Sequence, residues 1–318
     1  MLSMCYFYIL KIPVRLKAAK KRLRYNEDME CTSFRFEAIG THWRIDLREV
    51  LTPLDSSLLL AAIMERIGVF DLAYSRFRGD SLVAEMSRKE GRYQLPPDGS
   101  ALFFLYERVN RITHGKVTPL IGSVMEEAGY DKEYSLTPKV VHTPLSWDEA
   151  LVFDGSTLTL KKPVLLDVGA AGKGYLIDLV AVVIEKSGYH AYTIDAGGDI
   201  IYRNDKDKKA RIGLEHPLDT SKVIGVVTLG NESICGSAGN RRTWANFTHI
   251  IDPTTLASPT EILATWVIAD TTLLADMLAT CLFFVTPEEL APHFVFEYII
   301  LHQNFSLTYS ERVNAEFY

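Results

Sequence analysis

The stretch "PVLLDVGAAGKGYLIDLVAVVIEKSG", residues 163–188, is the clearest structural unit in the sequence. Its opening residues, "PVLLDVG", form a short apolar run that predicts a buried strand. The small residues of "AAGKG" predict a tight loop, and "YLIDLVAVVIEKSG" predicts a helix that is closed by Gly188. One face of this helix is apolar and consists of Leu176, Leu179, Val180, Val183 and Ile184.

Shorter units surround this one. Upstream, "FRFEAIGTHWRIDLR" predicts two strands around Gly40, and "SSLLLAAIMERIGVFDLAYSRF" predicts an amphipathic helix with a cap near Ser56. "SALFFLYERVNRITHG" predicts a second helix that stops at Gly115, and "ALVFDGSTLTLKK" predicts a hairpin about Asp154. Downstream, strands are predicted in "AYTIDAGGDIIYR", "KVIGVVTLG", "SICGSAG", "FEYIILHQN" and "FSLTYS". With no repeat and no obvious linker, this mixture predicts one α+β domain.

The stretch "LLADMLATCLFFV", residues 273–285, predicts a helix that is apolar nearly all round. Asp276 and Thr280 interrupt it and share one face, because they lie four residues apart. A carboxylate is costly in apolar surroundings unless it is paired. Carboxylate and hydroxyl oxygens suit Mg²⁺, which predicts a metal site. A buried pair without metal is the alternative, and the residues alone leave both open.

The loop "DVGAAGKGY", residues 167–175, places small residues between the predicted strand and helix. Backbone N–H groups in such a loop can approach a phosphate at a helix N-terminus, and Lys173 adds a positive charge. The glycines match neither the Walker A pattern nor the dinucleotide fingerprint. A tight structural turn therefore remains an equal alternative to a phosphate site.

Two further motifs carry polar side chains of the types that take part in catalysis. In "DAGGDI", Asp195 and Asp199 flank a Gly-Gly turn, and this pattern favours carboxylates that bond the turn's own backbone over direct chemistry. In "HIIDP", His249 precedes Asp252 by three residues, and a histidine near a carboxylate can act as a general base near neutral pH. Taken alone, such a histidine at a strand end is more often structural.

Bulk properties narrow the class of protein. The chain has 318 residues and a formal net charge of -6, which argues against a basic nucleic-acid-binding face. It contains no run of 18 apolar residues, so we expect no transmembrane span. The four cysteines form no CxxC pair and are interpreted as reduced thiols. Together with the lack of a secretory signal, they favour a cytoplasmic protein.

The first 28 residues differ from the rest, because a short apolar part is followed by a basic cluster. A secretory signal has the reverse order. We expect a disordered or artefactual N-terminal extension over residues 1–28, followed by the domain at 29–318. A weak membrane-surface anchor and an ordinary helix are the alternatives.

Five motifs, in order, resemble the ApbE-like FAD:protein FMN transferases. They are "DVGAAGKGY", "DAGGDI", "SICGSAGNRR", "HIIDP" and "LLADMLAT", and upstream "FEAIGTHW", "YSRFRGDS" and "HGKVTPLIGS" resemble the start of that family. The likeness covers about residues 34–300. It implies a single α+β flavin transferase domain with a mixed, largely antiparallel sheet and packed helices. It also implies Mg²⁺-dependent cleavage of FAD, transfer of FMN to a Thr or Ser hydroxyl of an acceptor protein, and release of AMP.

The resemblance implies roles for particular residues. His249 would be the base that accepts the proton of the hydroxyl, with Asp252 near it. The metal ligands would be the side chains of Asp276 and Thr280 and the backbone carbonyl of Ala170. By matching position, the flavin contacts would be Ile39, Phe77, Lys116, Val117, Thr118, Asp167, Lys173 and Ile250.

The chain departs from the family's pattern in two places. Relatives often have Phe-Asp where Val117 and Thr118 stand, and Arg-Thr-Gly where Thr254, Thr255 and Leu256 follow "HIIDP". These departures bear on the local loop shape and on the choice of substrate, and they leave the metal pair, Asp276 and Thr280, intact. The residues leave two other functions open, an FAD pyrophosphatase that gives FMN and AMP, and a non-catalytic flavin-binding protein.

Overall fold

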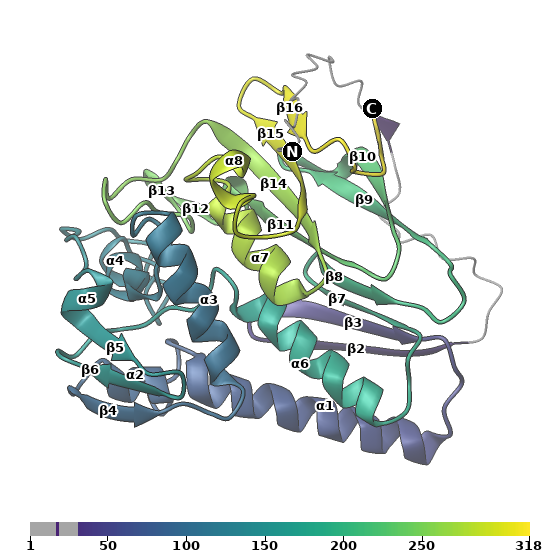
Figure 1. The fold of residues 1–318 in the computed structure, drawn as a ribbon, viewed down its shortest axis with the longest axis horizontal. Helices are drawn as coiled ribbons and strands as arrows, with labels where there is room; N and C mark the ends of the chain where they lie inside the picture. Colours follow the sequence, from purple (N-terminus) through teal and green to yellow (C-terminus); the bar gives the residue numbers. More distant parts are fainter. Residues whose placement is uncertain (1–16, 19–30) are drawn as a thin grey trace.

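An antiparallel sheet of eight strands forms the centre of the computed structural model, which describes residues 17–18 and 31–318 (Figure 1). The predicted extension over residues 1–28 and its boundary therefore lie outside the described residues, apart from Lys17 and Ala18. Across the sheet the strands are β16 (Leu307–Tyr309), β15 (Glu297–His302), β14 (Ile262–Ala269), β11 (Ser233–Ala238), β8 (Asp199–Arg203), β7 (Tyr192–Ala196), β3 (Thr41–Leu47) and β2 (Thr32–Ala38).

Tight turns set the register of the first hairpins, as the sequence predicted. Ile39 and Gly40 join β2 to β3, both at positive φ (45° and 73°), which a two-residue hairpin turn requires. Gly197 and Gly198 join β7 to β8, also at positive φ. A β-branched residue rarely adopts this conformation, so the backbone at Ile39 is strained.

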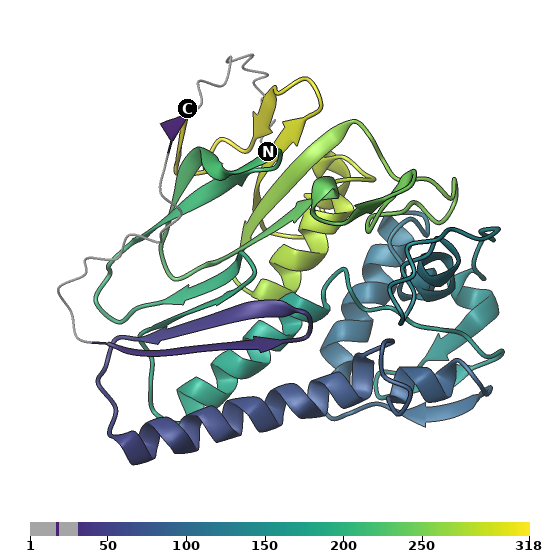
Figure 2. The same ribbon diagram turned by 180° about the vertical axis from the view of Figure 1, so that it is seen from behind.

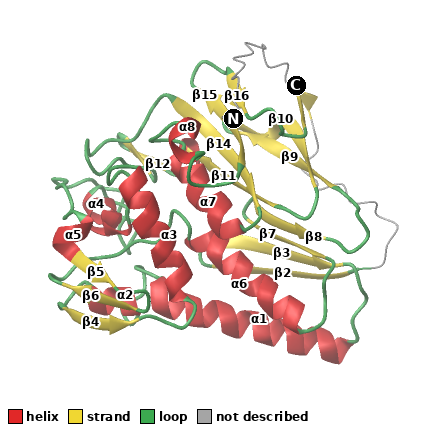
Figure 3. Cartoon of the chain, in the orientation of Figure 1, coloured by secondary structure: helices red, strands yellow, loops and turns green. Residues whose placement is uncertain are grey.

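Three helices cover one face of the sheet (Figures 1 and 3). They are α1 (Pro53–Tyr74), α6 (Gly172–Lys186) and α7 (Thr272–Cys281). Helix α1 begins earlier than predicted, because Thr52 rather than Ser56 caps it and accepts the N–H of Asp55 at 3.1 Å. Helix α7 lies over β11 and β14, and it ends at Cys281, before the predicted limit of 285.

A second sheet packs on the other face of the central sheet, over the part that contains β8, β11, β14 and β15 (Figure 2). It consists of β9 (Ala210–His216), β10 (Asp219–Leu229), β17 (Ala315–Phe317) and the short β1 (Lys17–Ala18). Its apolar side packs on the central sheet through a separate core that includes Tyr202, Ile212 and Ile299. The layers are therefore helices, central sheet and second sheet.

A smaller group of elements lies beside the helical layer, at the left of Figure 1. Helix α3 (Gly99–Ile112) is its longest element. The hairpin predicted about Asp154 is present as β5 and β6. The shorter elements here and elsewhere are α2 (Leu82–Met86), β4 (Gly91–Gln94), a 3-10 turn (Pro119–Ile121), α4 (Gly122–Glu127), α5 (Trp147–Ala150), β5 (Leu151–Phe153), β6 (Thr157–Leu160), a second 3-10 turn (Gly239–Arg241), β12 (Thr243–Trp244), β13 (Phe247–Thr248) and α8 (Pro287–Leu290).

The strand predicted for "PVLLDVG" is wrong, because residues 163–169 pair with no other strand. The N–H of Val164 bonds the carbonyl of Met86 at 3.2 Å, and the N–H of Asp167 bonds that of Pro119 at 2.7 Å. These two bonds run to separate segments and do not form a strand ladder. An apolar run alone cannot distinguish such a buried segment from a strand.

Helix α6 begins at Gly172, three residues before the predicted start, and its first turn lies against α7. A Cβ atom on Gly174 would lie 2.2 Å from the carbonyl oxygen of Thr272 and 2.6 Å from Cβ of Asp276. Both neighbours belong to α7, and one is backbone. The close approach of the two helices therefore requires glycine at position 174.

We expect Gly174→Ala to lower the free energy of unfolding by at least about 2 kcal/mol, because the added methyl group forces the helices apart. Urea denaturation of the variant and the wild-type protein measures the difference. Gly68→Ala is the matched control, since Gly68 is also helical and has nothing within 4 Å of its Cβ position. We expect that change to raise stability by up to about 1 kcal/mol. Equal stability of the two variants would contradict the packing argument.

Candidate active site

The carboxylate of Asp276 faces the first turn of α6. It is 4% exposed, and its Oδ2 accepts the backbone N–H of Gly174 at 2.8 Å. The residue at the start of α6, Ala171, provides no side-chain cap. Asp276 therefore caps a helix that lies 102 positions earlier in the chain, and the helix dipole favours its negative charge there.

Lys173 brings a positive charge to the same place. Its Nζ forms an ion pair with Oδ2 of Asp199 and lies 3.8 Å from Oδ1 of Asp276. Asp199 is fully buried at the start of β8, and its Oδ1 also accepts the N–H of Gly236 at 3.1 Å. One lysine thus faces two buried carboxylates, so this group carries excess negative charge when all three side chains are ionised. Asp195, in contrast, bonds the N–H of Gly198 at 2.8 Å, as the turn interpretation predicted.

Burial raises the pKa of Asp276 above its ordinary value, while Lys173 and the N–H of Gly174 act in the opposite direction. The distance of 3.8 Å from Oδ1 to Nζ exceeds hydrogen-bonding range, so Oδ1 is held less closely than Oδ2. One carboxylate oxygen is therefore committed to the helix, and the other is the better ligand for a cation.

Asp178 makes the reciprocal contact from α6 to α7. Its carboxylate accepts the N–H groups of Thr272 and Leu273 at 3.0 and 2.8 Å and the hydroxyl of Thr272 at 2.5 Å. Burial raises the pKa of Asp178 above its ordinary value. Each helix therefore supplies a carboxylate to the N-terminus of the other, which fixes their relative position.

Thr280 lies one turn beyond Asp276 on the same helix. Its Oγ1 lies 3.5 Å from Oγ of Ser237 at the end of β11, a weak contact that leaves the hydroxyl available. Ala170 lies two residues before the start of α6, in whose first turn Gly174 donates its N–H to Asp276. No group of three His, Cys, Asp or Glu side chains suited to a metal occurs within residues 31–318 or at 17–18. A metal here would thus depend on one carboxylate with hydroxyl and carbonyl oxygens.

Phe77 belongs to a group of aromatic rings and guanidinium groups beside this centre. Its ring lies flat on Tyr134, with centroids 5.3 Å apart, and meets Tyr130 edge-on at 5.6 Å. Arg76 stacks on Phe77 and donates from Nε to Oδ2 of Asp167 at 2.5 Å. Because Asp167 precedes Ala170 by three residues, this ion pair links the aromatic group to the loop before α6.

The segment of Lys116, Val117 and Thr118 lies next to a residue that bonds the backbone of Asp167. Thr118 is 8% exposed, and its hydroxyl accepts the N–H of Leu120 at 3.2 Å. The next residue, Pro119, accepts the N–H of Asp167 at 2.7 Å. Val117 is buried in the main core, and Lys116 reaches the carbonyl of Phe284 at 3.5 Å.

His249 follows β13, and its backbone is linked through Arg242 to the same aromatic group. Its N–H bonds the carbonyl of Arg242 at 3.2 Å, and Arg242 in turn donates to the hydroxyl of Tyr130. Asp252 accepts the N–H and hydroxyl of Thr254 at 2.8 and 2.6 Å, so its carboxylate stabilises its own turn. Ile250 is 5% exposed.

Ile39 stands apart from these groups, at the tip of the β2–β3 hairpin. That hairpin touches the next turn, where the N–H of Gly197 bonds the carbonyl of His42 at 3.1 Å. The contacts described above bring Lys173 to Asp276, and they link Phe77 to Asp167 through Arg76. They do not join Ile39 directly to either group.

Two cavities border these residues. One, of about 490 Å³, is lined in part by His114, Thr118, Pro253 and Thr254. It lies where the sequence departs from the family's pattern at both Thr118 and Thr254. The other, of about 1490 Å³, lies between the central and second sheets and reaches Gly236 and Ser237.

Comparisons with known proteins agree with the motifs and the fold. The sequence model of the ApbE family matches residues 39–296. The chain belongs to the ApbE family. A protein of Klebsiella pneumoniae named FAD:protein FMN transferase is 24% identical over 274 residues, covering 80% of this chain and 78% of that protein. One of Vibrio cholerae with the same name is 26% identical over 262 residues, covering 76% and 78%.

Solved structures of the family share the fold. The flavin transferase ApbE from Vibrio cholerae has a TM-score of 0.75 at 22% identity and covers 88% of this chain and 96% of its own. The ApbE protein from Thermotoga maritima has a TM-score of 0.76 at 20% identity, covering 89% and 97%. These matches confirm the predicted single α+β domain with a largely antiparallel sheet.

Three residues of this region were missed by the sequence analysis, namely Asp199, Asp178 and Arg76. Asp199 was interpreted as part of a turn, although a carboxylate directly before the apolar "IIY" indicates a buried charge. Asp178 was a signal of the same kind, since it interrupts the apolar helix over 175–188. Arg76 gave no signal, because its burial depends on distant segments.

No described helix has the length and apolar character needed to cross a bilayer.

We expect Asp178→Ala to lower the free energy of unfolding by about 1–2 kcal/mol, because α7 loses its reciprocal cap. Asp178→Asn keeps an acceptor oxygen and should lose less. Denaturant titration followed by circular dichroism measures both. If the alanine variant is as stable as the wild-type protein, the reciprocal contact does not stabilise the pair of helices.

Proposed function

We propose that the protein transfers FMN from FAD to a Thr or Ser hydroxyl of an acceptor protein, with Mg²⁺ and with release of AMP. The observation that carries the proposal is the arrangement of Lys173, Asp199 and Asp276 at the N-terminus of α6, in a chain of the ApbE family. Relatives over most of the chain bear the name FAD:protein FMN transferase.

The donor set fits Mg²⁺. Oδ1 of Asp276, the hydroxyl of Thr280 and the carbonyl of Ala170 are hard oxygen ligands, and Mg²⁺ is usually held by few protein groups together with substrate phosphates. The excess negative charge around Lys173 also favours a cation. Bound there, Mg²⁺ would neutralise charge that develops on the pyrophosphate.

The first turn of α6 supports binding of the pyrophosphate. The helix N-terminus offers N–H donors and a positive dipole end to an anion, and the ammonium group of Lys173 lies beside it. Lys173 is 30% exposed in its side chain, so a ligand can reach it. Phosphoryl transfer depends chiefly on such positioning and charge neutralisation.

The acceptor hydroxyl requires a base, and we assign that role to His249. The imidazole takes the hydroxyl proton while the oxygen attacks the FMN phosphorus, and the bond from that phosphorus to the bridging oxygen of AMP breaks. Asp252 would shape the loop that carries His249, because its carboxylate holds Thr254. Ile39, Phe77, Lys116, Val117, Thr118, Asp167 and Ile250 are proposed as the remaining flavin contacts.

We also propose that the reaction takes place in the cytoplasm. The described cysteines, Cys31, Cys235 and Cys281, are free thiols, which suits a reducing compartment.

The direct test incubates the protein with FAD, Mg²⁺ and a panel of candidate acceptor proteins. Mass spectrometry detects protein-bound FMN, and chromatography detects AMP. Failure to form either product across the panel would refute the transferase. Free FMN in the absence of any acceptor would indicate an FAD pyrophosphatase, and tight FAD binding without turnover would indicate a flavin-binding protein.

We expect Asp276→Asn to reduce Mg²⁺-dependent activity at least about 100-fold, because the amide loses the charge that binds the cation. The amide oxygen can still accept the N–H of Gly174, so the fold should persist, as circular dichroism can verify. Asp270→Asn is the control, since Asp270 is exposed at the end of β14. Wild-type activity in Asp276→Asn would remove this residue from the site.

We expect His249→Asn to slow transfer about 100- to 10,000-fold while FAD affinity changes little, because a general base acts in the chemical step. Turnover measured at saturating FAD, beside FAD affinity from flavin fluorescence, separates the two effects. A variant that loses affinity but keeps turnover would show a binding role instead.

A further inference from the structure

Of the three nitrogen atoms of the buried Arg76 guanidinium group, only Nε forms a hydrogen bond among the described residues. The residue is 5% exposed, and Nε donates to Oδ2 of Asp167 at 2.5 Å. Nη1 and Nη2 are both buried, and neither has a hydrogen-bond partner among the described residues. Buried donors are nearly always satisfied in proteins, because leaving them unpaired is costly. Such an exception indicates donors that are reserved for a ligand.

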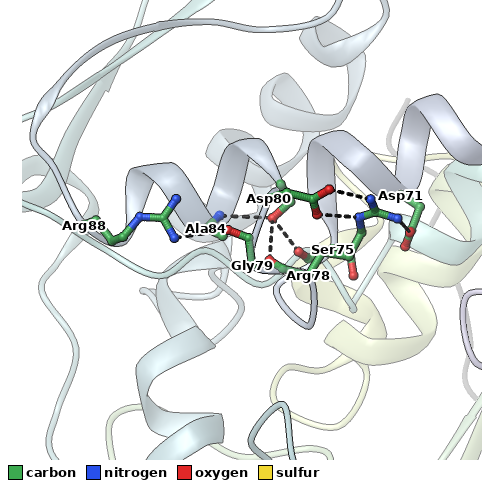
Figure 4. Close-up of polar contacts among 8 residues, drawn as sticks. Asp71, Ser75, Arg78, Gly79, Asp80, Ala84 and Arg88 are labelled. Atoms are coloured by element: carbon green, nitrogen blue, oxygen red, sulfur yellow. Dashed lines mark hydrogen bonds and ion pairs between the residues drawn. The ribbon is translucent and has the colours of Figure 1, made fainter.

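Arg78, two residues further on in the same loop, has all three guanidinium nitrogen atoms hydrogen-bonded. Figure 4 shows its guanidinium between two carboxylates, with Nη1 at 3.1 Å from Asp71 and Nε and Nη2 at 3.0 and 2.7 Å from Asp80. Arg78 is therefore well paired at the surface, whereas Arg76, in the interior, is not.

The loop that carries Arg76 is fixed at several points. The hydroxyl of Ser81 donates to the carbonyl of Ser75 at 2.6 Å. Arg88 donates to the carbonyl of Gly79 at 3.1 Å (Figure 4). The guanidinium is also stacked, with Cζ 4.2 Å from the ring centroid of Phe77 and 5.0 Å from that of Tyr130. Arg76 thus points in a set direction, as recognition of a planar ligand requires.

Charge and shape select the kind of group that fits. Because Arg76 is already paired with Asp167, an added phosphate would be repelled by that carboxylate, whereas a neutral carbonyl would not. A flavin ring offers two carbonyl oxygens that flank one N–H on its pyrimidine edge, and its flat face suits the ring of Phe77. This edge matches the Nη donors of Arg76 and the carboxylate acceptor beside them.

We propose that Arg76 determines specificity for the flavin ring by donating from its Nη atoms to a carbonyl oxygen of the pyrimidine edge. The inference rests on the proposed function and assigns a role to a residue that the family resemblance does not include. Both Nη atoms are buried, so a covering side chain must move when flavin binds. Tyr134 is suited to this, because its ring stacks on Phe77, on which Arg76 also lies. It is 53% exposed and lies in a segment without helix or strand.

The test measures binding rather than turnover, for FAD, FMN, riboflavin and ADP, by calorimetry and flavin fluorescence. We expect Arg76→Met to weaken the binding of FAD, FMN and riboflavin by the same factor, about 10- to 100-fold, because a charge-assisted hydrogen bond is lost. ADP affinity should not change. Arg76→Lys, which keeps the charge but not the planar fork, should give a smaller loss. Arg92→Met is the control, since Arg92 is an exposed arginine paired with Asp154.

Several results would overturn the role of Arg76. Unchanged riboflavin affinity in Arg76→Met would do so, and a loss confined to FAD and ADP would assign the residue to phosphate instead. If both variants fail to fold, 2-thio- and 4-thioriboflavin test the wild-type protein directly, because sulfur is a weaker acceptor than oxygen. Equal affinity for both thio analogues and riboflavin would refute the contact.

Failure of the proposed function can be distinguished from failure of the role proposed for Arg76. Flavin binding that depends on Arg76 in a protein without transfer activity would overturn the transferase and leave this inference standing. Wild-type protein that binds no flavin would overturn both.

Discussion

The reciprocal contact between α6 and α7 is the constraint on which the rest of the structure depends. Asp276 accepts the N–H of Gly174, and Asp178 accepts the N–H groups at the start of α7. Without a side chain at position 174 the helices approach closely enough for both bonds. The same approach brings Lys173 to Asp276. Helix packing and the polar centre therefore share residues, and neither can change without the other.

Burial gives this centre its chemical character. Asp199 and Asp276 are held in the interior by backbone N–H groups, and Lys173 offsets part of their charge. A buried carboxylate persists only when it is paired in this way. Because one lysine faces two carboxylates, the proposed function places a cation at this centre and an anion at the helix N-terminus beside it. A dinucleotide pyrophosphate with its metal provides both.

A second centre, around Arg76 and Phe77, is joined to the first by the segment from Asp167 to Gly174. Asp167 holds Arg76 at one end, and Lys173 faces Asp199 and Asp276 at the other. This segment passes through a turn at residues 169–171 and enters α6 at Gly172. It thus spans the distance between a place for a planar ring and a place for phosphates, which suits a ligand that contains both.

The sequence by itself determined the local features: the hairpins about Gly40 and Asp154, the apolar face of α6, and a common face for Asp276 and Thr280. Each follows from turn chemistry or from periodicity within one element, so neighbouring residues suffice. The sequence also required Asp276 to have a partner, but could not name it. Only the tertiary structure identified Gly174 and Lys173 as the partners of Asp276. It also showed that Asp199 forms a buried ion pair and that residues 163–169 pair with no strand. The reason is that burial, charge pairing and strand pairing depend on segments far apart in the chain, such as those of Gly174 and Asp276, which are 102 positions apart. A local pattern of residues does not show which distant segments come together.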